Sequence, residues 1–246
     1  MSPTRAPLLA LAATVALAAA ARAEAPPPAP TPATAAQLQT MLKLFAPVPI
    51  TVDVAALPAS EKKALAKLIE AARIMDGLFL RQAWAGNLPL LIDLAADGTP
   101  LGRARLQAFL LNKGPWDRLE HNRAFLPNVP AAKPAPADFY PLDATKADVE
   151  TWMKSLPPAD RARAEGFYTL IRRGTDGKLG IVPYAVAYAG ELATAAKLLE
   201  EAAQLTAEPT LRTFLQKRAA AFTSNDYYDS DVAWMNLAGQ IGRAHV

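Results

Sequence analysis

Hydrophobic residues recur at steps of three and four between residues 60 and 79, the pattern of an amphipathic helix. The apolar positions share one face of that helix and are Leu65, Leu68, Ile69, Ala72, Met75, Leu78 and Phe79. Charged residues fall between them, so the opposite face is polar. Ser60 follows Pro58 and precedes Glu61, which predicts Ser60 as the N-cap of this helix.

Similar periodicity predicts further helices over residues 37–45, 102–112, 184–205 and 209–222. Pro47 and Pro49 end the first of these helices, and Gly114-Pro115 ends the second. Thr145 opens another helix, because Asp148 at the third position forms a variant of the capping box. Residues 230–237 indicate the start of a further helix or a bend.

Strands are predicted only over residues 167–172 and 178–182. They flank residues 174–177, Gly-Thr-Asp-Gly, which suit a hairpin turn, and Pro183 ends the second strand. The fold class is therefore mainly α with a small β-hairpin (α+β).

Residues 113–145 contain six prolines and little periodicity, which predicts a long ordered loop. Its apolar anchors would be Trp116, Phe125, Phe139 and Tyr140. Such a loop usually lies across a domain surface or lines a cleft.

The N-terminus has the layout of a secretory signal peptide. Arg5 precedes an apolar run over residues 8–20, and Ala21-Arg22-Ala23 forms a cleavage site. The run is shorter than the roughly 20 residues of a membrane span, although an uncleaved anchor is the alternative. We expect a signal peptide over residues 1–23 cleaved after Ala23, a Pro/Ala-rich linker over residues 24–36 and a mostly helical region over residues 37–240. The mature chain would be periplasmic or secreted, without integral membrane association.

Composition removes several classes of site. The chain has no cysteine, which excludes disulfides and thiolate metal sites. Without Arg5 and Arg22, the 26 basic residues fall to 24, against 23 acidic ones. This balance does not favour binding to nucleic acid or to an anionic membrane surface.

Candidate chemical residues are few. His121 and His245 are the only histidines and form no H-E-x-x-H motif, so a loop histidine bonded to the backbone explains His121 better than a metal ligand does. Asp226, Asp229 and Asp231 lack the glycine and the twelfth-position glutamate of a calcium loop. Ser230 or Asp231 as the cap of the next helix is the better interpretation.

Two further patterns also have structural explanations. Gly174, Gly177 and Gly180 lack the Lys-Ser/Thr ending of a phosphate loop, so hairpin geometry accounts for them. Aromatic residues at Tyr184, Tyr188 and Trp234 are most simply core anchors. The residues alone therefore assign no catalytic or metal-binding role, and substrate-binding residues remain unknown.

A series of short motifs nevertheless follows the chain in order. They are ARIMDGLFLRQAW at residues 72–84, GPWDR at 114–118, FYP at 139–141, Thr145-Lys146, FYT at 167–169, Pro183-Tyr184 with Tyr188, Asp226-Tyr227 and SDVAWM at 230–235. This series resembles the N-terminal part of bacterial proteins similar to dipeptidyl-peptidase III, the M49 family of zinc peptidases. The resemblance covers residues 50–240.

The resemblance implies the N-terminal portion of a two-lobed metallopeptidase-like fold with a wide cleft between the lobes. In that family, a His-Glu-x-x-x-His segment and a further glutamate hold zinc, and a metal-bound water attacks the scissile carbonyl. A substrate strand begins near an Ile-Gly-x-x-Glu-x-Tyr segment, which would start shortly after residue 240. The 246 residues contain neither segment, so no zinc ligand or catalytic residue transfers to this chain.

Residues 241–246, Ile-Gly-Arg-Ala-His-Val, match what a common sequencing adapter encodes when it is read in frame. They are predicted to be a non-native tail, with the true homology ending near Gly239. Arg243 and His245 would then be artefacts.

The sequence therefore predicts a truncated N-terminal fragment of an exported zinc-dependent metallopeptidase or hydrolase, inactive as given. Zinc and a peptide or other small substrate would belong to the longer parent. The alternative is a complete, non-enzymatic periplasmic helical binding module.

Overall fold

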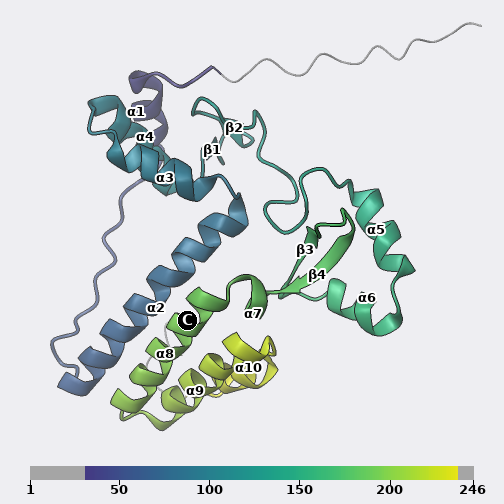
Figure 1. The fold of residues 1–246 in the computed structure, drawn as a ribbon. Helices are drawn as coiled ribbons and strands as arrows, with labels where there is room; N and C mark the ends of the chain where they lie inside the picture. Colours follow the sequence, from purple (N-terminus) through teal and green to yellow (C-terminus); the bar gives the residue numbers. More distant parts are fainter. Residues whose placement is uncertain (1–30, 238–246) are drawn as a thin grey trace, which may run out of the picture.

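The computed structural model describes residues 31–237 (Figure 1). The predicted signal peptide, most of the predicted linker and the predicted tail lie outside these residues. The helices are α1 (Ala35–Lys43), α2 (Ala59–Ala83), α3 (Asn87–Ala96), α4 (Pro100–Asn112), α5 (Lys146–Ser155), α6 (Pro158–Ala164), α7 (Tyr184–Ala187), α8 (Ala189–Leu205), α9 (Pro209–Ser224) and α10 (Tyr228–Met235). The strands are β1 (Trp116–Asp117), β2 (Arg123–Ala124), β3 (Thr169–Arg173) and β4 (Leu179–Pro183). The described chain is thus mainly helical with two small antiparallel strand pairs, which confirms the predicted fold class.

Helix α2 runs through the middle of the molecule and packs along α8, which in turn packs on α9 (Figure 1). The buried residues between these helices are mostly alanines, which let the helix axes approach closely. They are Ala64, Ala71, Ala196, Leu199, Ala202, Ala203, Leu215 and Ala219, here called the alanine cluster. Glu61 ties the start of α2 to the α8–α9 connection, because its carboxylate accepts bonds from Thr206 Oγ1 (2.9 Å) and the Ala207 N–H (2.6 Å).

A second cluster joins α1, α3 and α4 to the end of α2. Its buried residues are Leu38, Leu80, Leu94, Ala108, Phe109, Phe125 and Leu126, here called the phenylalanine cluster. Asn87 is buried at the centre of this region, and its Nδ2 donates to the carbonyls of Leu80 (3.0 Å) and Lys113 (3.3 Å). These bonds hold the end of α2 against the end of α4.

The long loop is anchored as predicted by Trp116 and Phe125, each 3% exposed. Trp116 Nε1 donates to the carbonyl of Pro130 (2.9 Å), and the ring meets Trp84 edge-on at 5.2 Å. The loop also contains the β1–β2 pair, which the sequence did not predict because each strand has only two residues.

The predicted hairpin is confirmed by β3 and β4, which pair antiparallel with Ile171 opposite Ile181. Its inner face packs on α2, α7 and α8 through a third cluster, formed by Leu78, Leu170, Tyr188 and Leu192. Gly177 adopts φ 77°, a left-handed conformation that suits glycine in the turn.

Two predicted helix starts were wrong. Helix α2 begins at Ala59 rather than after a Ser60 cap, because the Lys62 N–H already bonds to the Pro58 carbonyl (3.1 Å). Helix α10 begins at Tyr228, and Asp226 Oδ1 accepts its N–H (3.1 Å), so neither Ser230 nor Asp231 is the cap. Ser230 is buried inside that helix, where its Oγ donates to the Tyr227 carbonyl (2.8 Å).

Other predictions also need correction. The single helix predicted over residues 184–205 is broken at Tyr188, whose φ of −122° and ψ of 26° are not helical. Helices α3 and α6 were not predicted. Trp234 is 56% exposed and does not anchor the core. Within residues 31–237, no helix has both the length and the apolar composition required to span a bilayer.

Candidate functional site

A pocket of about 430 Å³ lies where the β3–β4 hairpin meets the end of α2, and we call it the hairpin pocket. It brings together side chains from segments that are far apart in the sequence. Its lining residues are Arg81, Ala85, Asp138, Leu170, Arg172, Val182, Ala187 and Tyr188. Charged groups and an apolar wall meet here, which is the usual composition of a small-molecule site.

Two ion pairs organise the hairpin pocket. Arg172 Nη2 donates to both the carbonyl (2.7 Å) and Oδ2 (2.9 Å) of Asp138, which fixes the loop against β3. Arg81 Nη1 donates to Glu191 Oε1 (2.5 Å), which joins α2 to α8. Burial raises the pKa of Asp138, and the positive charges of Arg172 and Arg81 act in the opposite direction. Each arginine of the lining is thus paired with a carboxylate, Arg172 with Asp138 and Arg81 with Glu191.

Tyr188 lines the hairpin pocket at the break between α7 and α8. The residue is 4% exposed, and the Arg81 guanidinium lies 5.1 Å from the centre of its ring. Burial raises the pKa of the Tyr188 hydroxyl, while the Gln82 side chain and the two arginines lower it. Tyr188 thus keeps its proton at neutral pH, and its hydroxyl is buried.

Further tyrosines extend from the pocket towards α10. The ring of Tyr184 meets Tyr188 at 5.3 Å and Tyr168 at 6.2 Å, and Tyr168 lies 4.1 Å from Tyr227. Burial raises the pKa of Tyr184 to about 12. The predicted anchoring role of Tyr184 and Tyr188 is confirmed by these contacts.

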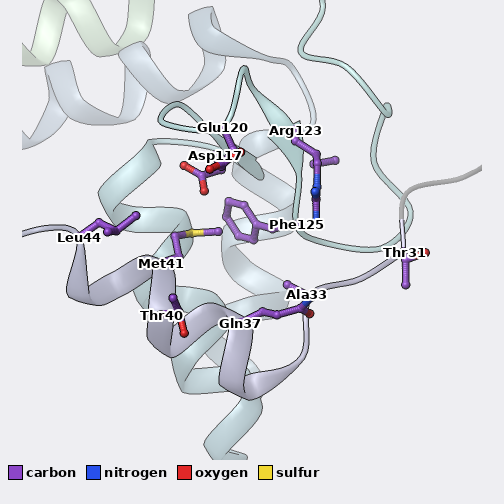
Figure 2. A pocket seen from close by; sticks show the side chains of 11 residues that line it. Thr31, Ala33, Gln37, Thr40, Met41, Leu44, Asp117, Glu120, Arg123 and Phe125 are labelled. Carbon is purple, nitrogen blue, oxygen red and sulfur yellow. The ribbon is translucent and has the colours of Figure 1, made fainter.

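A second hollow of about 310 Å³ lies between α1 and the β1–β2 turn (Figure 2). Figure 2 shows Met41 and Phe125 pointing towards each other, with Asp117 and Glu120 beside them. Asp117 is only 5% exposed, and its Oδ1 accepts the N–H of Leu119 (2.9 Å). This carboxylate therefore holds the turn, and the hollow has no paired acid and base.

The residues considered for metal binding are separated in the structure. His121 is exposed in the β1–β2 turn at φ 51°. Asp231 pairs with Arg218 (2.6 Å), Asp229 lies 3.9 Å from Lys217, and Asp226 precedes α10 and accepts the N–H of Tyr228. Across residues 31–237, no three His, Asp or Glu side chains gather as a metal site would require.

The three glycines of the hairpin have the structural role that the sequence suggested. Gly174 donates its N–H to the Lys178 carbonyl (2.8 Å), and Gly177 provides the turn conformation. No helix follows the turn, since β4 begins at Leu179.

Sequence reasoning missed the charged groups of the hairpin pocket. Arg81 lies within the motif at residues 72–84, and no local pattern indicates a functional role for Arg81, Asp138 or Arg172. Asp138 and Arg172 are 34 positions apart, and Arg81 and Glu191 are 110 apart. No local pattern marks residues at such separations as partners.

Comparisons with known proteins cover most of the chain. No family model matches it. The chain is 29% identical over 249 residues to Nudix hydrolase 3 from Arabidopsis thaliana, and the alignment covers 81% of this chain and 32% of that protein. The solved dipeptidyl-peptidase III from Corallococcus sp. strain EGB superposes with a TM-score of 0.82 at 58% identity, over 85% of this chain and 39% of that one. The solved DPP III from Caldithrix abyssi superposes with a TM-score of 0.76 at 42% identity, over 81% of this chain and 37% of that one. The chain thus spans about a third to two fifths of the length of these relatives.

Proposed function

This chain is a dipeptidyl-peptidase III-like fragment. We propose that it is the N-terminal scaffolding part of an exported zinc-dependent peptidase or related hydrolase. The observation that carries the proposal is the likeness to the Corallococcus structure, at 58% identity over 85% of this chain. Identity at that level over a continuous fold supports common ancestry as well as common architecture. The curated relative named a Nudix hydrolase supports less, because the chain covers only 32% of it at 29% identity.

The residues of this chain would hold the fold of one lobe in place rather than take part in the hydrolytic reaction. Arg172 and Asp138 fix the long loop on the hairpin, and Arg81 and Glu191 fix α2 on α8. Because each of these charges is paired within the fold, none is left over for acid–base chemistry. The two ion pairs at the hairpin pocket would therefore stabilise one lobe of the larger protein.

The described residues do not fit a zinc site. Zinc in proteins takes four ligands in close tetrahedral contact, usually from cysteine, histidine and carboxylate side chains. The chain has no cysteine, and among residues 31–237 neither His121 nor the aspartates at the start of α10 belong to a group of three potential ligands. We therefore assign the zinc ligands and the catalytic base to a part of the parent outside residues 31–237.

Export belongs to the same proposal. Its support is the sequence of the first 23 residues, with Arg5, the apolar run over residues 8–20 and a cleavage site ending at Ala23. Residues 24–36 would then tether the folded part, and residues 241–246 would be foreign to it.

The first test reads the source DNA past codon 240 and expresses the longer product. We expect the frame to continue into Ile-Gly-x-x-Glu-x-Tyr and His-Glu-x-x-x-His segments. Elemental analysis should find one zinc per chain in the longer product, and an activity assay should show that it releases dipeptides from peptide substrates. The 246-residue chain should neither hold zinc nor release dipeptides.

His121→Ala provides the matched control, because it removes the one histidine among the described residues. The zinc content of the longer product should not change in this variant. One tightly held zinc in the 246-residue chain would contradict the proposal. A genuine stop codon after Val246 would instead favour the non-enzymatic binding module.

A further inference from the structure

The segment between α1 and α2 has the sequence of a strand without a sheet. From Pro47 to Val54 it reads PVPITVDV, in which every second residue is a β-branched apolar one. Apolar and polar residues alternate from Ile50 to Val54, as in a half-buried strand, and valine, isoleucine and threonine favour strands. In Figure 1 the segment runs as an extended trace along one side of α2.

The apolar positions of this segment are exposed. Val48 is 75% exposed, Ile50 is 97% exposed and Val52 is 78% exposed. Their backbone N–H groups have no hydrogen-bond partner among residues 31–237. Such a row of apolar side chains and unpaired backbone is a hazard that proteins normally cover.

The prolines show which edge of the strand can be paired. In a strand, alternate residues direct their side chains to opposite faces and their backbone groups to opposite edges. Pro47 and Pro49 lie on one edge and lack the N–H that a ladder needs. The other edge carries the backbone groups of Val48, Ile50 and Val52, all with an N–H. The segment is therefore built to pair on one side only.

The C-terminal end of the segment is fixed by local bonds. Asp53 Oδ1 accepts the N–H of Ala55 (2.8 Å), and the Val54 carbonyl accepts the N–H of Leu57 (3.2 Å). These turns stop the strand before α2 begins. The stretch available for pairing therefore ends with the last of the alternating residues.

We propose that residues 47–54 form an edge strand that adds to a β-sheet in the part of the parent protein outside this chain. The inference rests on the proposed function, since it requires a longer parent. The solved relatives extend well beyond this chain, which covers only 39% and 37% of them. Within the described residues, the hairpin lies beyond the other side of α2 in Figure 1, so it is not the partner.

Hydrogen exchange read by mass spectrometry tests the inference on unaltered protein. In the 246-residue chain, the amides of residues 48–54 should exchange as fast as an unstructured peptide. In the longer product of the same gene, they should exchange at least about tenfold more slowly, because a paired strand opens only with its sheet. Equally fast exchange in both proteins overturns the inference, as does a gene product no longer than this chain.

A pair of substitutions tests the face of the strand. Ile50→Lys should lower the melting temperature of the longer product by several degrees and leave that of the 246-residue chain unchanged. Thr51→Lys, on the opposite face, should change neither. If Ile50→Lys prevents folding of the longer product, Ile50→Thr gives the same comparison with less disruption. Equal effects of the two lysine variants would overturn the assignment.

The remaining outcomes separate the two proposals. Slow exchange in a longer product that lacks zinc and peptidase activity would support the strand and overturn the proposed function. A longer product that holds zinc and has peptidase activity, but in which residues 48–54 exchange fast, would support the proposed function and overturn the strand. A dimer of the 246-residue chain that Ile50→Lys dissociates would assign the strand to a second copy and overturn the inference.

Discussion

Tyr184 lies between Tyr168 and Tyr188, with ring centroids 6.2 and 5.3 Å away. Burial raises its pKa from 10.0 to about 12, and Tyr188 and Tyr227 act in the same direction, whereas Arg172 acts against them. An ionised Tyr184 is therefore less stable in the folded chain than in the unfolded one. As the pH rises, the unfolded chain releases this proton first, so the stability contributed by the neutral hydroxyl is lost between pH 10 and about pH 12.

Replacing Tyr184 by phenylalanine should remove this contribution. We expect the free energy of unfolding of Tyr184→Phe to fall less steeply between pH 10 and about pH 12 than that of the unaltered chain. Urea unfolding at a series of pH values measures the difference. Tyr228→Phe, which alters a residue that is 74% exposed, is the control. A steeper fall in the Tyr184 variant would contradict the assignment.

At the scale of secondary structure elements, two helical glycines are in opposite environments. A Cβ added at Gly77, inside α2, would meet nothing within 4 Å. A Cβ added at Gly102, near the start of α4, would lie 2.2 Å from Asp97 Cγ and 2.4 Å from the Asp97 carbonyl oxygen. Gly102 also donates its N–H to Thr99 Oγ1 (2.9 Å), which caps the helix.

The same substitution should therefore have opposite effects in the two helices. Gly77→Ala should stabilise the chain by about 0.5–1 kcal/mol, because alanine loses less backbone freedom in a helix. Gly102→Ala should destabilise it by about 1–3 kcal/mol, because the backbone of Asp97 must move. Chemical denaturation of both variants gives the comparison. Stabilisation by Gly102→Ala would contradict this prediction, because it would mean that Asp97 shifts away from the new Cβ at little energetic cost.

The sequence predicted elements whose signals are local. The periodicity of α2, the Thr145 capping box and the glycines of the β3–β4 turn all act within a few residues. Helix α3 was missed because its sequence, NLPLLIDLAA, has almost no polar face and carries Pro89 in its first turn, where proline is tolerated. The break at Tyr188 was missed because the apolar pattern continues across it. The ion pairs of the hairpin pocket depend on the tertiary fold and leave no local pattern.

At the scale of the whole molecule, α2 contributes to every cluster. Ala71 belongs to the alanine cluster, Leu80 to the phenylalanine cluster, and Leu78 to the cluster beneath the hairpin. The alanine and phenylalanine clusters share no other helix. The described chain is thus arranged as packed regions that all draw on one helix.

This arrangement predicts that the two ends of α2 lose structure separately. Phe109 is fully buried in the phenylalanine cluster, and Phe109→Ala should cost about 3–5 kcal/mol there. Hydrogen exchange should then show lost protection in α1, α3 and α4, while the amides of α8 and α9 keep theirs. Phe167→Ala, at a residue that is 91% exposed, should change neither region. Equal loss of protection in α8 and α9 would instead show one cooperative unit, which is the behaviour expected of a self-contained binding module rather than of part of a larger lobe.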